Sequence, residues 1–129
     1  MPDRRPRIAL VDDNESVLKG LRRMLEPDYD VVGCFTSSAA FLEVAPRLLP
    51  DAVVLDLFMY GIDGLEACRQ VVQTLPHINV VILTASDEDA FEHAARSAGA
   101  RAFVRKYAIA TDLLPAIEQA CSQRDGDEQ

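Results

Sequence analysis

Four short runs of apolar residues in the chain each end at a polar residue, and helix-like segments separate the runs. The runs and the residues that follow them are Ile8 to Val11 before Asp12, Ala52 to Leu55 before Asp56, Val80 to Leu83 before Thr84, and Ala102 to Val104, which leads through Arg105 to Lys106. Continuous apolar runs of this length are typical of parallel strands that are buried on both faces. The carboxyl ends of parallel strands lie at one edge of the sheet, where open α/β sheets have their sites. The pattern therefore predicts that polar residues from four distant places meet at one edge.

A further strand covers residues 31–35, and apolar residues at helical spacing follow each strand. We place the helices around these positions: 17–25, 41–45, 65–75, 91–98 and 113–121. Ser37 or Ser38 is the candidate cap of the second helix, and Pro46 and Pro50 are expected to separate that helix from the third strand. Strand and helix alternate five times, which predicts one parallel α/β domain. We assign residues 1–6 to an N-terminal extension, 7–122 to the domain, and 123–129 to a tail or linker to an output domain outside this segment.

The net charge of −8 over 129 residues argues against nonspecific binding to nucleic acid. No apolar stretch approaches the roughly 20 residues that a membrane-spanning helix needs, and the basic N-terminus is not followed by the apolar core of a signal peptide. We therefore expect a cytoplasmic protein with no direct contact to nucleic acid or membrane. The three cysteines have no Cys-x-x-Cys spacing, and we interpret them as packed thiols.

Asp12, Asp13 and Asp56 bring three carboxylates to the predicted edge. Asp favours turns and helix N-caps, so the pair Asp12 and Asp13 alone has a purely structural explanation. Asp56 changes this interpretation, because three clustered carboxylates repel one another and are costly to ionise together without a cation. Mg²⁺, with Mn²⁺ as a substitute, is the kind of hard ion that prefers such oxygen ligands.

Asp56 is then the natural nucleophile, because carboxylates form acyl phosphates in phosphoryl transfer. Thr84 can donate a hydrogen bond to one phosphoryl oxygen, and Lys106 can neutralise a second. Either residue alone is more often structural or solvent-exposed. In this order, after apolar runs and together with the acids, they indicate an aspartyl phosphate site.

These residues and their surroundings resemble the receiver domain of bacterial two-component response regulators, over residues 7 to 122. The matching segments are Leu10 to Asn14, Leu55 to Met59, Gly61 to Gly64, Leu83 to Ser86 and Gly99 to Lys106. The resemblance implies a flavodoxin-like, doubly wound sheet with strand order 2-1-3-4-5 and five helices. Tyr60 and Tyr107 stand where the family often has Pro, and neither change removes a chemical group from the site.

The resemblance also implies a role for each site residue. Asp56 is the phosphoacceptor, Asp12 and Asp13 belong with it to the Mg²⁺ pocket, the carbonyl of Phe58 completes the metal shell, Lys106 binds phosphate, and Thr84 and Phe103 form the switch pair. Phosphorylation draws Thr84 toward the phosphate, and Phe103 rotates from solvent into the vacated space, which shifts the population toward a second conformation.

We expect a histidine kinase or phosphotransfer protein to supply the phosphoryl group in a phosphorelay. The chain would catalyse its own phosphorylation and slow dephosphorylation without being an enzyme on other substrates, and the output is expected to be transcription. The altered surface is the fourth helix, fifth strand and fifth helix. There we predict a homodimer or a docked output module, with Arg101 and Arg105 beside Phe103 pairing with acidic residues of a neighbour.

Three other functions fit the sequence less well. A hydrolase with an aspartate nucleophile usually has a second acid two residues later, where this chain has Phe58. A flavodoxin-like cofactor binder needs a phosphate loop after a strand, and Asp12 and Asp13 would repel phosphate there. A receiver that serves only as a protein-binding module would not need all five site residues.

Overall fold

The computed structural model describes residues 4–59 and 63–127, with side chains described as far as residue 122. The ends of the predicted extension and tail (1–3 and 128–129) and the motif residues Tyr60, Gly61 and Ile62 lie outside the described residues.

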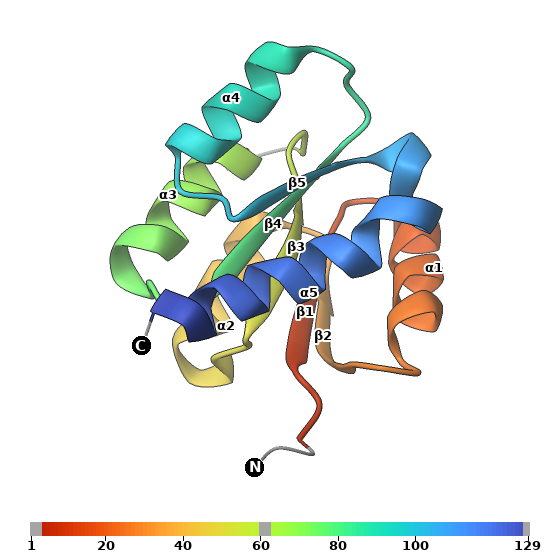
Figure 1. Ribbon diagram of the computed structural model, residues 1–129, viewed down its shortest axis with the longest axis vertical. Coiled ribbons are helices and arrows are strands. Elements are labelled where there is room, and N and C mark those ends of the chain that lie inside the picture. Colours follow the sequence, from red (N-terminus) through yellow and green to blue (C-terminus); the bar gives the residue numbers. More distant parts are fainter. Residues whose placement is uncertain (1–3, 60–62, 128–129) are drawn as a thin grey trace.

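Within this part of the chain, strands and helices alternate from the first strand to the last helix (Figure 1). The strands are β1 (Arg7–Val11), β2 (Asp30–Phe35), β3 (Ala52–Asp56), β4 (Asn79–Thr84) and β5 (Ala102–Arg105). The helices are α1 (Glu15–Leu25), α2 (Ser38–Leu48), α3 (Gly64–Thr74), α4 (Asp89–Ser97) and α5 (Ile109–Asp127), and a short 3₁₀ turn, η1 (Lys106–Ala108), joins β5 to α5. All four strand pairings are parallel, and the order is β2-β1-β3-β4-β5, which confirms the flavodoxin-like α/β fold.

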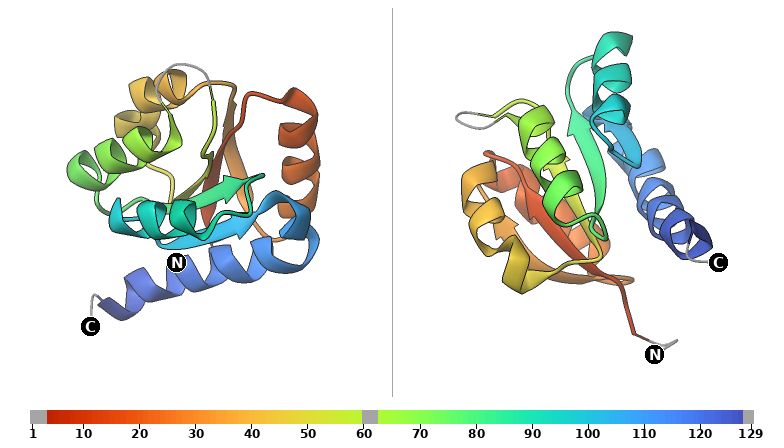
Figure 2. Two further views of the ribbon diagram at one scale, coloured as in Figure 1. Left: turned by 90° about the horizontal axis from the view of Figure 1, so that it is seen from above. Right: turned by 90° about the vertical axis from the view of Figure 1, so that its left-hand side faces the viewer.

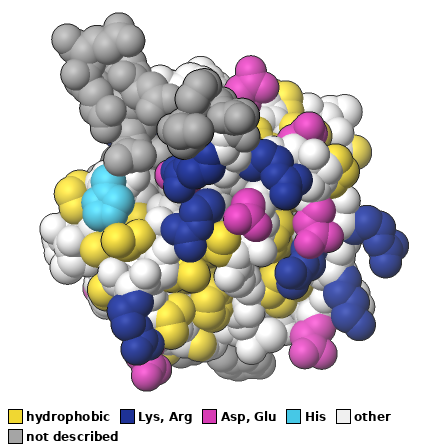
Figure 3. Space-filling view, turned by 90° about the horizontal axis from the view of Figure 1, so that it is seen from below, with side chains coloured by type: hydrophobic (Ala, Val, Ile, Leu, Met, Phe, Trp, Pro, Cys, Tyr) yellow, Lys and Arg dark blue, Asp and Glu magenta, His cyan; other side chains and the backbone are white. Residues whose placement is uncertain are grey.

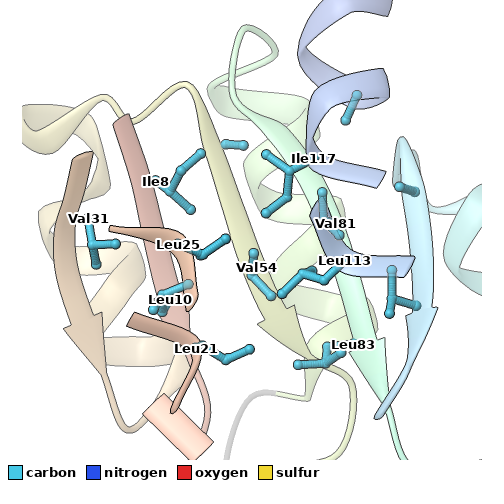
Figure 4. Packing of buried hydrophobic residues seen from close by; sticks show 14 of the residues in the cluster. Ile8, Leu10, Leu21, Leu25, Val31, Val54, Val81, Leu83, Leu113 and Ile117 are labelled. Carbon is cyan, nitrogen blue, oxygen red and sulfur yellow. The ribbon is translucent and has the colours of Figure 1, made fainter. Parts of the chain in front are cut away.

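Helices cover both faces of the sheet, with α1 and α5 on one face and α2, α3 and α4 on the other (Figure 2). Beneath α1 and α5 lies a core of aliphatic side chains from these helices and from every strand (Figure 4). The second core packs Phe41 of α2, Cys68 of α3 and Ala95 of α4 against the central strands. Because β3 and β4 are buried on both faces, their sequences are continuously apolar rather than alternating.

Local side-chain bonds fix where the helices begin. Asn14, Ser37 and Asp63 each accept a hydrogen bond from a backbone N–H in the first turn of α1, α2 and α3, respectively. Pro46 does not separate α2 from β3 as predicted, because it lies inside α2, which continues to Leu48 and packs that side chain against the core. The last helix extends to Asp127, through residues that were predicted to form a tail.

Gly64 lets α3 begin very close to the end of β3. A Cβ atom at this position would lie 2.5 Å from the backbone oxygen of Asp56 and 2.6 Å from Cα of Leu57. Only glycine tolerates such an approach. The Gly64 amide uses it to donate a 2.9 Å hydrogen bond to the carbonyl of Leu57, which fixes the backbone directly after Asp56.

Candidate functional site

The register of the strands brings the predicted residues to one edge of the sheet. Val11 of β1 pairs with Leu55 of β3, so the residues that follow them, Asp12 and Asp56, lie on neighbouring strands at the same level. Asp56 pairs with Leu83 of β4, and Thr84 pairs with Arg105 of β5, so Lys106 leaves the sheet at this edge too. Residues separated by almost the whole length of the chain therefore meet because parallel strands end together.

Asp12, Asp13 and Asp56 form one cluster of carboxylates. One oxygen from each lies within 4.8 Å of the others. Asp12 and Asp56 are buried and Asp13 is exposed, so the cluster opens to solvent on the Asp13 side.

The carboxylate of Asp56 is held by two hydrogen bonds. Oδ1 accepts from the backbone N–H of Phe58 at 3.2 Å, and Oδ2 accepts from Nζ of Lys106 at 3.3 Å. The residue is 4% exposed. A carboxylate oriented in this way on rigid backbone is a preorganised acceptor for an incoming electrophile.

Lys106 is the cation of the cluster. Its Nζ lies 2.9 Å from Oδ2 of Asp12 as well as 3.3 Å from Oδ2 of Asp56. One ammonium thus neutralises part of the charge of three carboxylates, and a net negative charge remains in the pocket.

The remaining charge and the free oxygen lone pairs fit a divalent cation. Asp12 Oδ1 accepts from the N–H of Asn14 at 2.9 Å, but the buried Oδ2 forms only the ion pair with Lys106 and accepts no hydrogen bond from the described residues. Asp12 shares the single ammonium of Lys106 with Asp56, so the charge of the two buried carboxylates is only partly compensated, and a further cation would stabilise them. The oxygen-only donor set of the cluster is the set that Mg²⁺ and Mn²⁺ prefer.

The environment shifts the pKa of both central groups. Burial raises the pKa of Asp56 above its usual value; the charge of Asp12 adds to the rise, and the ammonium of Lys106 opposes it. Burial alone would lower the pKa of Lys106, but the attraction of Asp12 and Asp56 outweighs it, so this pKa is raised. Lys106 therefore stays charged, whereas ionised Asp56 is destabilised.

Thr84 is fully buried at the end of β4, next to the strand that carries Asp56. Its Oγ1 accepts a 3.2 Å hydrogen bond from the N–H of Ser86, and Oγ of Ser86 accepts one of 3.1 Å from the N–H of Glu88. The Thr84 hydroxyl is thus linked through two hydrogen bonds to the start of α4.

Phe58 holds the acceptor through its backbone N–H and contacts α4 through its ring. Its ring is 48% exposed and packs edge-to-face on Phe91 of α4, with ring centroids 4.9 Å apart. Phe58 and Met59 also line a cavity of about 310 Å³ with Asp13 and Asp63. The contact with Phe91 was missed in the sequence, where Phe91 was interpreted only as part of an apolar helix stripe.

Phe103 of β5 is half-buried and packs against the core under α4. The sequence predicts that Arg105 pairs with acidic residues of a neighbouring molecule, and that remains a prediction; within the chain Arg105 already has acidic partners. Its guanidinium lies 3.1 Å from Asp89, 3.7 Å from Glu92 and 3.8 Å from Asp87 of the same chain. These partners are 13 to 18 positions away, and no local sequence signal connects them.

Charge differs between the two edges of the sheet. Exposed acids surround the carboxylate cluster at the carboxyl edge: Asp13, Glu15, Asp63, Glu66, Asp87, Glu88 and Asp89. The opposite edge, where Arg4, Arg5 and Arg7 lie at the start of β1, is seen from below in Figure 3, where Lys and Arg side chains are interspersed with Asp and Glu side chains. The acids at the site edge therefore favour the binding of cations there.

The chain is similar in sequence to a known protein family and to individual bacterial regulators. Residues 8–118 match the response regulator receiver domain. The chain is 34% identical over 116 residues to the transcriptional regulatory protein LiaR of Bacillus subtilis, a match that covers 88% of this chain and 55% of LiaR. It is 40% identical over 114 residues to the response regulator GacA of Pseudomonas viridiflava, covering 86% of this chain and 53% of GacA. The chain thus spans about half the length of these curated relatives.

Solved structures share the fold. A LuxR-family two-component response regulator from Aurantimonas sp. SI85-9A1 superposes with a TM-score of 0.88 at 34% identity, over 93% of this chain and 87% of that chain. The isolated REC domain of RcsB from Salmonella enterica serovar Typhimurium, solved in the presence of the phosphomimetic BeF₃⁻, gives a TM-score of 0.82 at 25% identity, over 93% and 98%. Among the described residues of this chain, no helix is both long and apolar enough to cross a membrane.

We predict that Asp56→Asn stabilises the metal-free protein near neutral pH and that this gain disappears in acid. The fold raises the pKa of Asp56 above its ordinary value of 3.8, so between these two values the folded state binds more protons than the unfolded state. The free energy of unfolding of the wild type therefore falls as the pH rises through this window, and it stays lowered above the folded pKa. Asn carries no charge and escapes this loss.

Urea unfolding in the presence of a chelator, repeated at several pH values, measures the difference in the free energy of unfolding between Asp56→Asn and the wild type. The difference should be largest at neutral pH and shrink as the pH approaches the ordinary pKa of Asp. A difference that grows as the pH falls would show that the charge of Asp56 stabilises the fold.

Proposed function

The chain belongs to the response regulator receiver domain family, and we propose that its Asp56 accepts a phosphoryl group from a histidine kinase or phosphotransfer protein. The observation that carries the proposal is the environment of Asp56. This buried carboxylate is oriented by the N–H of Phe58 and the ammonium of Lys106, beside two further acids that fit a divalent cation.

In the proposed reaction, a carboxylate oxygen of Asp56 attacks the phosphorus of a phosphohistidine. The new bond is P–O, the bond that breaks is P–N, and the imidazole leaves with the electron pair and takes up a proton. Lys106 neutralises a phosphoryl oxygen as a point charge, and the Thr84 hydroxyl donates a hydrogen bond to another. The N–H of Phe58 keeps the carboxylate in place during the attack.

Asp12, Asp13 and Asp56, with the carbonyl of Phe58, are the residues that would hold Mg²⁺, or Mn²⁺ in its place. When bound, the ion neutralises negative charge on the carboxylates and on the transferring phosphoryl group. The exposed position of Asp13 leaves this side of the cluster accessible to both the ion and the phosphodonor.

The phosphorylated site is proposed to act as a switch. The phosphoryl group brings nearly two negative charges to a pocket beside the strand that ends at Thr84. If Thr84 turns toward the phosphate, its hydrogen bond with the N–H of Ser86 breaks, and the connection to α4 is released. Phe103, which is half-buried, then moves inward, and the surface of α4, β5 and α5 changes.

The residues beside the acceptor favour slow self-dephosphorylation. Phe58 offers no polar group two residues beyond the acceptor to orient an attacking water, and Ser86 offers no charge.

The relatives that this chain matches over half their length include a transcriptional regulatory protein. We propose that the domain controls an output domain of this kind from the cytoplasm, as a phosphorylated switch without substrates of its own.

Phosphorylation of Asp56 can be measured directly. Incubation with acetyl phosphate and Mg²⁺ should add one phosphoryl group to the wild type, as measured by intact mass. Asp56→Asn should add none, because the nucleophilic oxygen is lost, and a chelator should abolish the reaction. Asp28→Asn, an exposed Asp at the opposite edge of the sheet, is the matched control and should react like the wild type. No addition to the wild type, or an equal addition to Asp56→Asn, contradicts the proposal.

The surface formed by α4, β5 and α5 is a candidate interface. A cavity of about 280 Å³ on this surface is lined by Phe103 and Arg101 of the β5 region and by residues of α5 such as Asp112. We propose that this surface forms a homodimer, or docks the output domain, after phosphorylation. Sedimentation velocity should show a dimer of the wild type with beryllofluoride and Mg²⁺ and a monomer without them, while Asp56→Asn stays monomeric. An unchanged mass of the wild type argues against the dimer.

A further inference from the structure

Arg105 holds the connection between β4 and α4 from outside the phosphorylation site. Its guanidinium donates hydrogen bonds to the carbonyl of Asp87 at 3.2 Å and to Oδ1 of Asp89 at 3.1 Å. It also forms ion pairs with Asp87 and with Glu92 one turn into α4. The Arg105 side chain is only 19% exposed, whereas that of Asp89 is 99% exposed. One cation from β5 thus fixes both the loop and the first turn of the helix.

The same guanidinium lies over the ring of Phe103, with Cζ 5.6 Å from the ring centroid. This distance is in the range of a cation–π contact. Arg105 and Phe103 are two residues apart in one strand and project from the same side of it. Inward rotation of Phe103 would break this contact.

The loop that Arg105 holds is the one that begins at Thr84. The N–H of Ser86 donates to the Thr84 hydroxyl, and the N–H of Glu88 donates to the Ser86 hydroxyl, so the loop is hydrogen-bonded from the site to the start of α4. Movement of Thr84 toward a phosphoryl group breaks its hydrogen bond with Ser86 and so releases residues 85–89 from the site. Asp87 and Asp89, which lie in this stretch, are the residues that Arg105 binds.

We propose that Arg105 is a positioning residue that holds the loop after Thr84, together with Phe103, in the resting arrangement. This inference rests on the proposed function of Asp56 as phosphoacceptor. Arg105 touches neither the acceptor nor the metal ligands, and it acts through the two elements of the switch. Its contacts exist in the resting arrangement, so they oppose the change that phosphorylation favours.

Thermodynamic linkage gives the direction of the effect. A probe that binds only the second conformation has an apparent affinity lower than its intrinsic affinity. The apparent affinity falls as more of the protein is in the resting conformation. Removal of the Arg105 contacts lowers the free energy cost of the second conformation and so tightens binding. The loss of a positive charge near an anion would act the other way, so tighter binding cannot come from charge alone.

The test is the affinity for beryllofluoride at saturating Mg²⁺, measured by titration from the amide NMR signal of Ser86. Arg105→Gln should bind about three- to tenfold more tightly than the wild type, the range expected for loss of an ion-pair network and one cation–π contact. Arg69→Gln is the matched control, because Arg69 is an exposed arginine of α3 that pairs with Glu66 and shares no partner with Arg105, and it should bind like the wild type. Without the probe, the Ser86 signal of Arg105→Gln should be displaced toward its probe-bound position.

A second pair of variants keeps the test decisive if Arg105→Gln does not fold. Asp89→Asn removes one partner of Arg105, and Glu88→Gln removes a charge next to it that is not a partner. Asp89→Asn should bind beryllofluoride more tightly than Glu88→Gln. Equal affinities in both pairs overturn the role of Arg105 and leave the phosphoacceptor proposal standing. If the wild type does not bind the probe at all, the phosphoacceptor proposal fails, and this inference fails with it.

Discussion

The structure is organised around the repulsion among three carboxylates that the sheet brings together. Asp12 and Asp56 are buried at the ends of two neighbouring strands. Ionisation of a carboxylate is most costly when it is buried next to another carboxylate. Lys106 reduces this cost but does not remove it, because one ammonium faces more than one negative charge. Net negative charge therefore remains at the site, and binding of a cation stabilises the folded protein. A divalent cation meets this need and leaves the Asp56 carboxylate available for chemistry.

The same arrangement links the chemistry to distant parts of the surface. Thr84 stands at the end of the strand next to Asp56, and two consecutive hydrogen bonds lead from its hydroxyl to α4. Phe58 connects the other side of the acceptor to α4 through its edge-to-face contact with Phe91. A change of charge at Asp56 is therefore opposed or favoured by contacts of α4, a helix that contributes no group to the reaction. These contacts are the physical basis on which the proposed phosphoryl group would alter a remote face.

Much of the fold and of the carboxylate cluster could be predicted from the sequence, because both depend on strong local patterns. The buried strands are short apolar runs, and parallel strands that end together bring Asp12, Asp56 and Lys106 into contact without knowledge of any loop. Other features depend on tertiary packing and left no local signal. Pro46 looked like a helix breaker but is tolerated inside α2. The ion pairs of Arg105 with Asp89 and Glu92 left no local signal either, since the sequence does not show that α4 packs over β5.

The most direct test of the charge constraint is thermal unfolding of the protein with and without Mg²⁺. If the three carboxylates share one ion, Mg²⁺ should raise the melting temperature of the wild type, by an amount that grows with its concentration. Asp13→Asn removes an exposed ligand without disturbing the core and should lose most of this gain, while Asp28→Asn, which makes the same change at the opposite edge, should keep it. Equal gains for the wild type, Asp13→Asn and Asp28→Asn, or no gain for the wild type, would contradict the account.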